Sequence, residues 1–158
     1  MAKTITFSEV DGSELAIGIV VARWNQEYTF ALRDEVLRAL KDSKVAKKNI
    51  IVQEVPGSFE LVYGASAMIQ DHNVDAVVCI GVLIKGDTLH FEHVAEAVAQ
   101  GIADINARGD VPIIFGVLPC LSEDQAKPRA ARKTGYGYGW GRSAVEMGIL
   151  RKSRLSRD

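Results

Sequence analysis

The sequence predicts an α/β fold in which one parallel sheet of four strands is covered by helices on both faces. Two observations predict it. Four apolar runs rich in Val and Ile resemble strands that are buried on both sides. Segments with helical spacing of apolar residues separate these runs, and strands that alternate with helices form parallel sheets. The runs are residues 15–21, 49–55, 75–80 and 111–115.

Two helical segments lie in the first half of the chain. Leu32, Val36 and Leu40 recur at helical spacing and predict a helix over residues 28–42. A second helix, over residues 58–71, follows a Pro-Gly turn. Each helix connects two consecutive strands, as a parallel pair requires.

Three further helices are expected in the second half. Residues 91–108 are rich in Ala and stop at Gly109, and Ser122 begins the next helix with two acidic residues in its first turn. A last helix is expected over residues 142–150. The glycine-aromatic stretch at residues 135–141 is expected to be a loop, because repeated glycines disfavour a helix.

Length and composition indicate one globular domain over residues 1–158, with an N-terminal arm at residues 1–13 and a frayed basic tail at residues 151–158. The formal charge of −1 gives no general case for nucleic acid, although RNA or membrane binding by the tail is an alternative. No signal-peptide segment is seen, and no apolar run approaches the ~18 residues of a membrane span. We therefore expect a cytoplasmic protein.

One segment offers both an anion site and an acid–base group. Residues 81–91 follow the third strand and precede a helix, and a glycine-bearing turn at a helix N-terminus suits phosphate. Thr88 is the expected N-cap, Lys85 adds positive charge, and His90 can move protons near neutral pH. Neither G-x-x-x-x-G-K-[ST] nor G-x-G-x-x-G is present, so a small phosphorylated substrate fits better than a nucleotide.

A metal site is not expected in this segment. His90 and His93 lie three residues apart, with Glu92 and Glu96 nearby. A metal ion needs more ligands in a fixed geometry. His93 is better interpreted as a residue of the helix surface or of an interface.

Unusual polar and aromatic side chains also follow the first two strands, and ligands of open α/β sheets bind beyond the carboxyl ends of the strands. Trp24 could stack on a flat heterocycle or cap the core. Asn25 could bind the edge of a heterocycle or serve as a helix N-cap. Ser58 and Glu60 suit a polyol chain, but they also suit plain helix capping.

Four motifs in this order resemble the lumazine synthase family, and the tryptophan of the first resembles its fungal branch. The resemblance runs from about residue 15 to residue 147. It implies a single-domain flavodoxin-like three-layer sandwich. The motifs are Arg23-Trp24-Asn25, residues 55–61 (VPGSFEL), residues 81–92 (GVLIKGDTLHFE) and residues 112–118 (PIIFGVL).

This family performs the penultimate step of riboflavin biosynthesis, a transferase reaction. It joins 5-amino-6-(D-ribitylamino)uracil to 3,4-dihydroxy-2-butanone 4-phosphate, releases phosphate and water, and gives 6,7-dimethyl-8-ribityllumazine without a metal or an organic cofactor. The resemblance implies that His90 is the proton-transfer residue. The residues implied to bind ribitylaminouracil are Trp24, Asn25, Ser58, Phe59, Glu60, Val82, Leu83, Ile84 and Phe115. Those implied to bind the butanone phosphate are Gly86, Asp87, Thr88 and Arg129.

The resemblance also implies a homopentamer with sites between subunits. Phe115 and Arg129 would then come from the neighbouring subunit, as a ring wall and as a guanidinium whose fork of donors suits phosphate. The short turn of many shell-forming relatives is absent, which favours an isolated pentamer over an icosahedral shell. Pro128 departs from the family pattern; a proline inside a helix costs about 3 kcal/mol, so a shift of Arg129 is expected.

A non-catalytic module that binds riboflavin or a lumazine is the alternative to an enzyme. Trp24 motivates it, because a stacking ring binds a finished flavin as well as a substrate. A structural ring protein with a vestigial site is a third reading. The intact segment at residues 81–90 argues against that reading, because packing alone does not require this combination.

Overall fold

Four parallel strands form one sheet in the computed structural model, which describes residues 5–157. The strands are β1 Ile17–Ala22, β2 Ile50–Val55, β3 Ala76–Ile84 and β4 Ile113–Cys120. They stand in the order β2-β1-β3-β4, and each neighbouring pair is parallel. The direction of the chain across the sheet therefore reverses between β1 and β3, which is where flavodoxin-like sheets bind their ligands.

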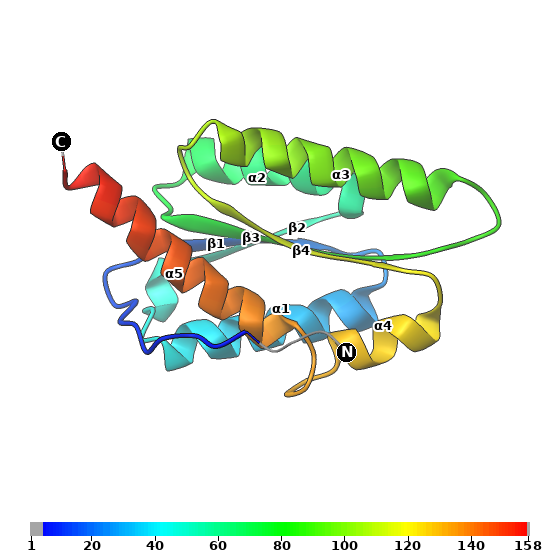
Figure 1. The fold of residues 1–158 in the computed structure, drawn as a ribbon, viewed down its shortest axis with the longest axis horizontal. Coiled ribbons are helices and arrows are strands. Elements are labelled where there is room, and N and C mark those ends of the chain that lie inside the picture. The colour runs from blue at the N-terminus through cyan, green and yellow to red at the C-terminus, as the bar shows by residue number, and fades with distance from the viewer. Residues whose placement is uncertain (1–4, 158) are drawn as a thin grey trace.

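Helices cover both faces of the sheet (Figure 1). One face carries α2 and α3, and the other carries α1, α4 and α5. The predicted fold class, a three-layer α/β sandwich with a parallel sheet, is confirmed. The helices are α1 Gln26–Asp42, α2 Leu61–Asp71, α3 His90–Ala107, α4 Glu123–Ala130 and α5 Gly137–Leu155, with two short 3-10 helices, η1 Lys47–Asn49 and η2 Ser58–Glu60.

The core lies on both sides of the central strands. All six residues of β1 are buried, and alternate side chains enter opposite layers: Ile19 and Val21 pack with one cluster, and Val20 with the other. This agrees with the prediction of a strand covered on both faces. The edge strand β2 differs from it, because residues 52–54 are exposed there.

The third and fourth strands are longer than predicted. Instead of ending at residue 80, β3 continues to Ile84 because its pairing with β4 continues to the partners Ile84 and Cys120. Gly81 is therefore a strand residue. The connection to α3 is reduced to residues 85–89.

The prediction of a loop over the whole glycine-aromatic stretch, residues 135–141, is wrong. The helix α5 begins within it, at Gly137. The reason is close packing of α5 against α1. A Cβ at Gly137 would lie 2.7 Å from the Leu32 carbonyl oxygen, and one at Gly141 would lie 2.6 Å from the Ala39 Cβ. The glycines lower helix propensity, but they let the two helices approach closely.

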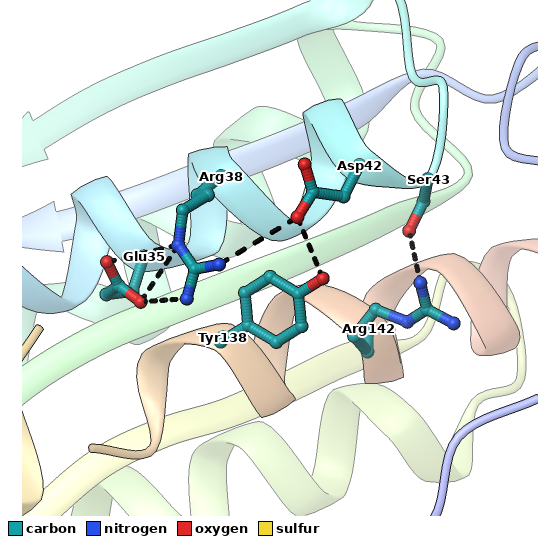
Figure 2. Close-up of polar contacts among 6 residues, drawn as sticks. All are labelled: Glu35, Arg38, Asp42, Ser43, Tyr138 and Arg142. Atoms are coloured by element: carbon teal, nitrogen blue, oxygen red, sulfur yellow. Dashed lines mark hydrogen bonds and ion pairs between the residues drawn. The ribbon is translucent and has the colours of Figure 1, made fainter. Parts of the chain in front are cut away.

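Polar contacts complete this helix pair (Figure 2). The Tyr138 hydroxyl donates to Asp42 at 2.9 Å, and the Arg38 guanidinium lies 4.2 Å from the centre of the Tyr138 ring. Arg38 also donates to the buried carboxylate of Glu35 at 2.6 Å. The contacts of Tyr138 with α1 thus stabilise the first turn of α5, although its glycines disfavour a helix.

The basic tail is also more ordered than predicted, because α5 continues to Leu155. Arg151 donates to the Asp75 carboxylate at 3.1 Å and to the Asp110 carbonyl at 3.0 Å, and Arg154 donates to the Gly109 carbonyl at 3.0 Å. At the other end, residues 5–13 of the predicted arm contain no helix or strand, and its residues 1–4 lie outside the described part. Within residues 5–157, no helix combines the length and apolarity needed to cross a membrane.

Candidate active site

A cavity of about 700 Å³ opens at the carboxyl ends of β1, β2 and β3. It brings together most of the residues that the sequence predicted: Trp24, Asn25, Ser58, Phe59, Glu60, Val82, Leu83, Ile84, Gly86, Thr88 and His90. It lies at the reversal between β1 and β3, the position expected for this topology.

Four further lining residues were not predicted. Pro56 and Gly57 directly precede Ser58, so their position in the turn was the available signal. Phe91 and Val94 extend the wall along the first turns of α3. Their spacing of three places them on the same side of the helix, but apolar residues at helical spacing usually indicate core.

Trp24 is held by its backbone and leaves its ring free. Its N–H donates to the Pro56 carbonyl at 2.9 Å, and the N–H of Arg23 donates to the Val55 carbonyl at 2.8 Å. These bonds tie the loop after β1 to the end of β2. The side chain is 74% exposed, so the alternative of a tryptophan that caps the core is wrong. An exposed indole at a cavity wall can stack on a flat ligand.

Asn25 ties two strand ends together. It adopts a left-handed conformation, with φ 61° and ψ 42°, which asparagine tolerates better than most residues. Its side-chain nitrogen donates to the Val82 carbonyl at 2.8 Å, and its side chain makes no capping bond to α1. Asn25 does stand at the N-cap of α1, as one alternative predicted, and its carbonyl accepts the Tyr28 N–H at 2.9 Å. Its side-chain amide joins the loop after β1 to β3 rather than capping the helix.

The segment after β2 combines capping with a cavity wall. Glu60 Oε2 accepts a hydrogen bond from the Gly57 N–H at 3.0 Å, so Glu60 has a capping role, at the start of η2. Gly57 rather than Ser58 stands at the N-cap of η2, and α2 itself begins at Leu61. The Glu60 side chain also lines the cavity, which leaves its other oxygen available for a ligand. Ser58 is buried beside Gly81, and Phe59 is 62% exposed.

The loop after β3 begins α3 with an open glycine turn. The Lys85 N–H donates to the Cys120 carbonyl at 2.9 Å, which fixes the start of the loop to the end of β4. The helix begins at His90, one residue later than a Thr88 cap implies, yet the Thr88 hydroxyl accepts the His90 N–H at 3.3 Å. A Cβ at Gly86 would meet nothing within 4 Å, so space for a ligand remains there.

An ion pair joins the two flanks of this loop. Lys85 Nζ contacts Glu92 Oε1 in the first turn of α3. The hydrogen bond from Lys85 lowers the pKa of Glu92 below its ordinary value. Across residues 5–157, no group of three His, Cys, Asp or Glu side chains is arranged to hold a metal ion.

Three predicted site residues lie apart from the cavity in this single chain. Asp87 is exposed in the loop but is not among the described residues that line the cavity. Phe115 on β4 is 40% exposed and lines a second cavity of about 420 Å³. Arg129 on α4 donates to the Gln125 carbonyl at 2.8 Å, and Pro128 does not end this helix, which continues to Ala130.

Comparison with known proteins gives one consistent family. The family model described as 6,7-dimethyl-8-ribityllumazine synthase matches residues 14–152. A protein of that name from Bacteroides fragilis is 45% identical, over 77% of this chain and 85% of its own length. The proteins of that name from Schizosaccharomyces pombe and Pyricularia oryzae are 43% and 38% identical, over 90% of this chain and 91% and 90% of their own lengths. This chain therefore belongs to the 6,7-dimethyl-8-ribityllumazine synthase family.

Proposed function

We propose that this protein is a lumazine synthase of riboflavin biosynthesis. As a transferase, it joins 5-amino-6-(D-ribitylamino)uracil to 3,4-dihydroxy-2-butanone 4-phosphate and forms 6,7-dimethyl-8-ribityllumazine, phosphate and water. The observation that carries the proposal is the composition of the cavity at the β1–β3 reversal. In a chain of this family, it combines an exposed indole, a hydroxyl and a carboxylate, an open glycine turn and a histidine.

The heterocycle would bind between the ends of β1 and β3. Trp24 would stack on the pyrimidine ring, and residues 82–84 would line the ring with backbone groups. The Asn25 amide nitrogen is already bonded to the Val82 carbonyl, so its oxygen would be the group left to accept a bond from the ring. Ser58 and Glu60 would hold the ribityl hydroxyls, with Phe59 beside them.

The phosphate would bind at the turn before α3. Gly86 and Thr88 line the cavity, and the start of a helix favours an anion. The Asp87 carboxylate would repel a phosphate, so Asp87 would contribute its backbone N–H. This role is supported by the exposure of the whole loop and by the free space at Gly86.

His90 would transfer the protons that the condensation requires. The amine of the pyrimidine attacks the carbonyl of the four-carbon substrate, and loss of water then forms a Schiff base. Both this step and the departure of phosphate need protons moved at neighbouring atoms. His90 lines the cavity two residues after Thr88, so its imidazole would stand between the phosphate and the reacting carbon.

The site would be completed by a second copy of this chain in a homopentamer. Phe115 would close the ring pocket of the neighbour, and Arg129 would bind its phosphate. Both lie outside the cavity of their own chain and on its surface, which supports this assignment. An isolated pentamer rather than a shell, a shift of Arg129 caused by Pro128, and a cytoplasmic location stay predictions.

Formation of the lumazine from the two purified substrates, followed by absorbance, tests the proposal. The wild-type protein should exceed the uncatalysed condensation, which is the necessary control. His90→Ala should lower the rate about 10²-fold or more, as expected for a general acid–base residue. Product at the background rate from a folded wild-type protein, together with tight riboflavin binding, would instead indicate a binding module.

A further inference from the structure

The loop of residues 85–89 is held at both flanks by contacts of Lys85. The backbone N–H of Lys85 bonds to the Cys120 carbonyl, and its side chain pairs with Glu92 across the loop. Residues 86–90, which lie between these contacts, are all exposed. The ion pair therefore closes the loop onto the first turn of α3, which carries His90.

The pair lies outside the cavity that the loop helps to form. Gly86 and Thr88 line this cavity, whereas Lys85 and Glu92 are not among the described residues that do. Both side chains are about two-fifths exposed, at 41% and 39%. The second oxygen of Glu92 is shielded from solvent and has no hydrogen-bond partner within residues 5–157, so Lys85 is the described partner of this carboxylate.

We propose that the Lys85–Glu92 ion pair is a clamp that positions the loop for the phosphate-bearing substrate, and that Lys85 does not itself bind the phosphate. The inference rests on the proposed function. A short loop with few internal bonds must lose conformational freedom when it binds a ligand, and a contact that restricts it beforehand lowers that cost. Lys85 and Glu92 are thus positioning residues, and they act through Gly86 and Thr88.

Four variants and one control test this role by steady-state kinetics. Lys85→Met and Glu92→Gln should each raise KM for the butanone phosphate about two- to fivefold, the range that an exposed ion pair supports. The double variant should be no worse than either single one, because the pair has then already been lost. KM for the pyrimidine should not change. Lys85→Arg should keep the wild-type KM for the butanone phosphate, because a guanidinium can also pair with Glu92. Glu96→Gln, one turn further along α3, is the matched control and should have no effect.

Two outcomes would overturn the clamp. A large loss in Lys85→Met with no loss in Glu92→Gln would make Lys85 a direct phosphate ligand. Unchanged KM in both would show that the loop does not depend on the pair.

A measurement without substrate separates failure of the clamp from failure of the proposed function. Amide hydrogen exchange of residues 85–89 should be faster in Lys85→Met and Glu92→Gln than in the wild type, and unchanged in Glu96→Gln. This result is expected even if the wild type makes no lumazine. Equal exchange in all four proteins would refute the clamp, whatever the activity.

Discussion

Gly81 and Gly86 stand five residues apart in one motif, but the structure gives them different roles. A Cβ at Gly81 would lie 2.4 Å from the Ser58 hydroxyl oxygen and 3.0 Å from Leu61 Cδ1. Gly81 is therefore needed for packing between β3 and the segment after β2. At Gly86 the surrounding space is open, so a requirement for glycine there would come from a ligand.

Two alanine substitutions test this difference. Gly81→Ala should lower the free energy of unfolding by about 1–3 kcal/mol, because Ser58 must move to admit a methyl group. Gly86→Ala should change it by no more than about 0.5 kcal/mol, but should weaken binding of the butanone phosphate. Urea denaturation of both variants measures the first effect and KM the second. Equal stability losses would contradict these roles.

At the scale of elements, the packed surface between α1 and α5 contains a carboxylate whose pKa changes when the chain folds. Glu35 is 7% exposed, and the hydrogen bond from Arg38 lowers its pKa below the ordinary value of 4.5. A carboxyl whose pKa is lower in the folded protein adds stability that is complete above its unfolded pKa. This stability is lost as the pH falls through the folded pKa.

We therefore expect the free energy of unfolding to fall as the pH drops below about 4.5, with Glu35 as one contributor. Glu35→Gln should be less stable than the wild type at pH 7, by about 1 kcal/mol, and should lose less stability on acidification. Denaturant unfolding at several pH values between 7 and about 3 measures both effects. An unchanged pH slope in the variant would contradict the assignment.

The far end of α5 is anchored by charged side chains rather than by apolar ones. Arg151 joins the buried Asp75 to the Asp110 carbonyl, and Asp75 Oδ2 also accepts the Ala16 N–H at 2.8 Å. The neighbouring Lys152 is farther from Asp75, at 3.9 Å, and is 44% exposed. Arg151 is therefore expected to contribute more than Lys152 to holding the end of α5 against the sheet.

Arg151→Ala should lower the free energy of unfolding by about 1–3 kcal/mol, because it leaves a carboxylate oxygen of Asp75 with one partner fewer in a part-buried site. Lys152→Ala is the matched control and should cost less than about 0.5 kcal/mol, as for other exposed pairs. Thermal or urea unfolding of the two variants gives the comparison. If Arg151→Ala behaves like Lys152→Ala, the helix end is not anchored by this contact.

At the scale of the whole molecule, one chain holds the cavity but not all the groups assigned to the reaction. Phe115 and Arg129 lie on other parts of the surface. If neighbouring subunits of a ring supply them, then His90 of one subunit acts with Arg129 of the next. Such a head-to-tail arrangement pairs different surfaces of the same chain.

Mixed oligomers test this arrangement directly. His90→Ala and Arg129→Ala should each be nearly inactive alone, but unfolding and reassembling them together should restore about a quarter of wild-type activity, because chance pairing makes that share of interfaces intact. Mixing His90→Ala with His90→Gln is the control and should restore nothing. Sedimentation velocity gives the size of the mixed particle. No recovery in a correctly sized oligomer would place both residues in the same subunit's site or remove one from it.

The sequence alone determined the alternation of strands and helices, the parallel sheet and the cluster of candidate residues at the strand ends. These depend on local features: apolar periodicity, and side-chain types such as Trp24 and His90 placed just after a strand or at a helix start. The tertiary structure alone decided that residues 137–141 are helical, that Asn25 bonds to Val82, and that Lys85 pairs with Glu92 outside the cavity. Two of these depend on contacts between segments far apart in the chain. The glycines of α5 leave room for α1 to pack closely, and β3 presents the carbonyl that Asn25 binds. The third depends on the path of the loop, which brings the two ends of a short segment together, and residue order does not specify that path.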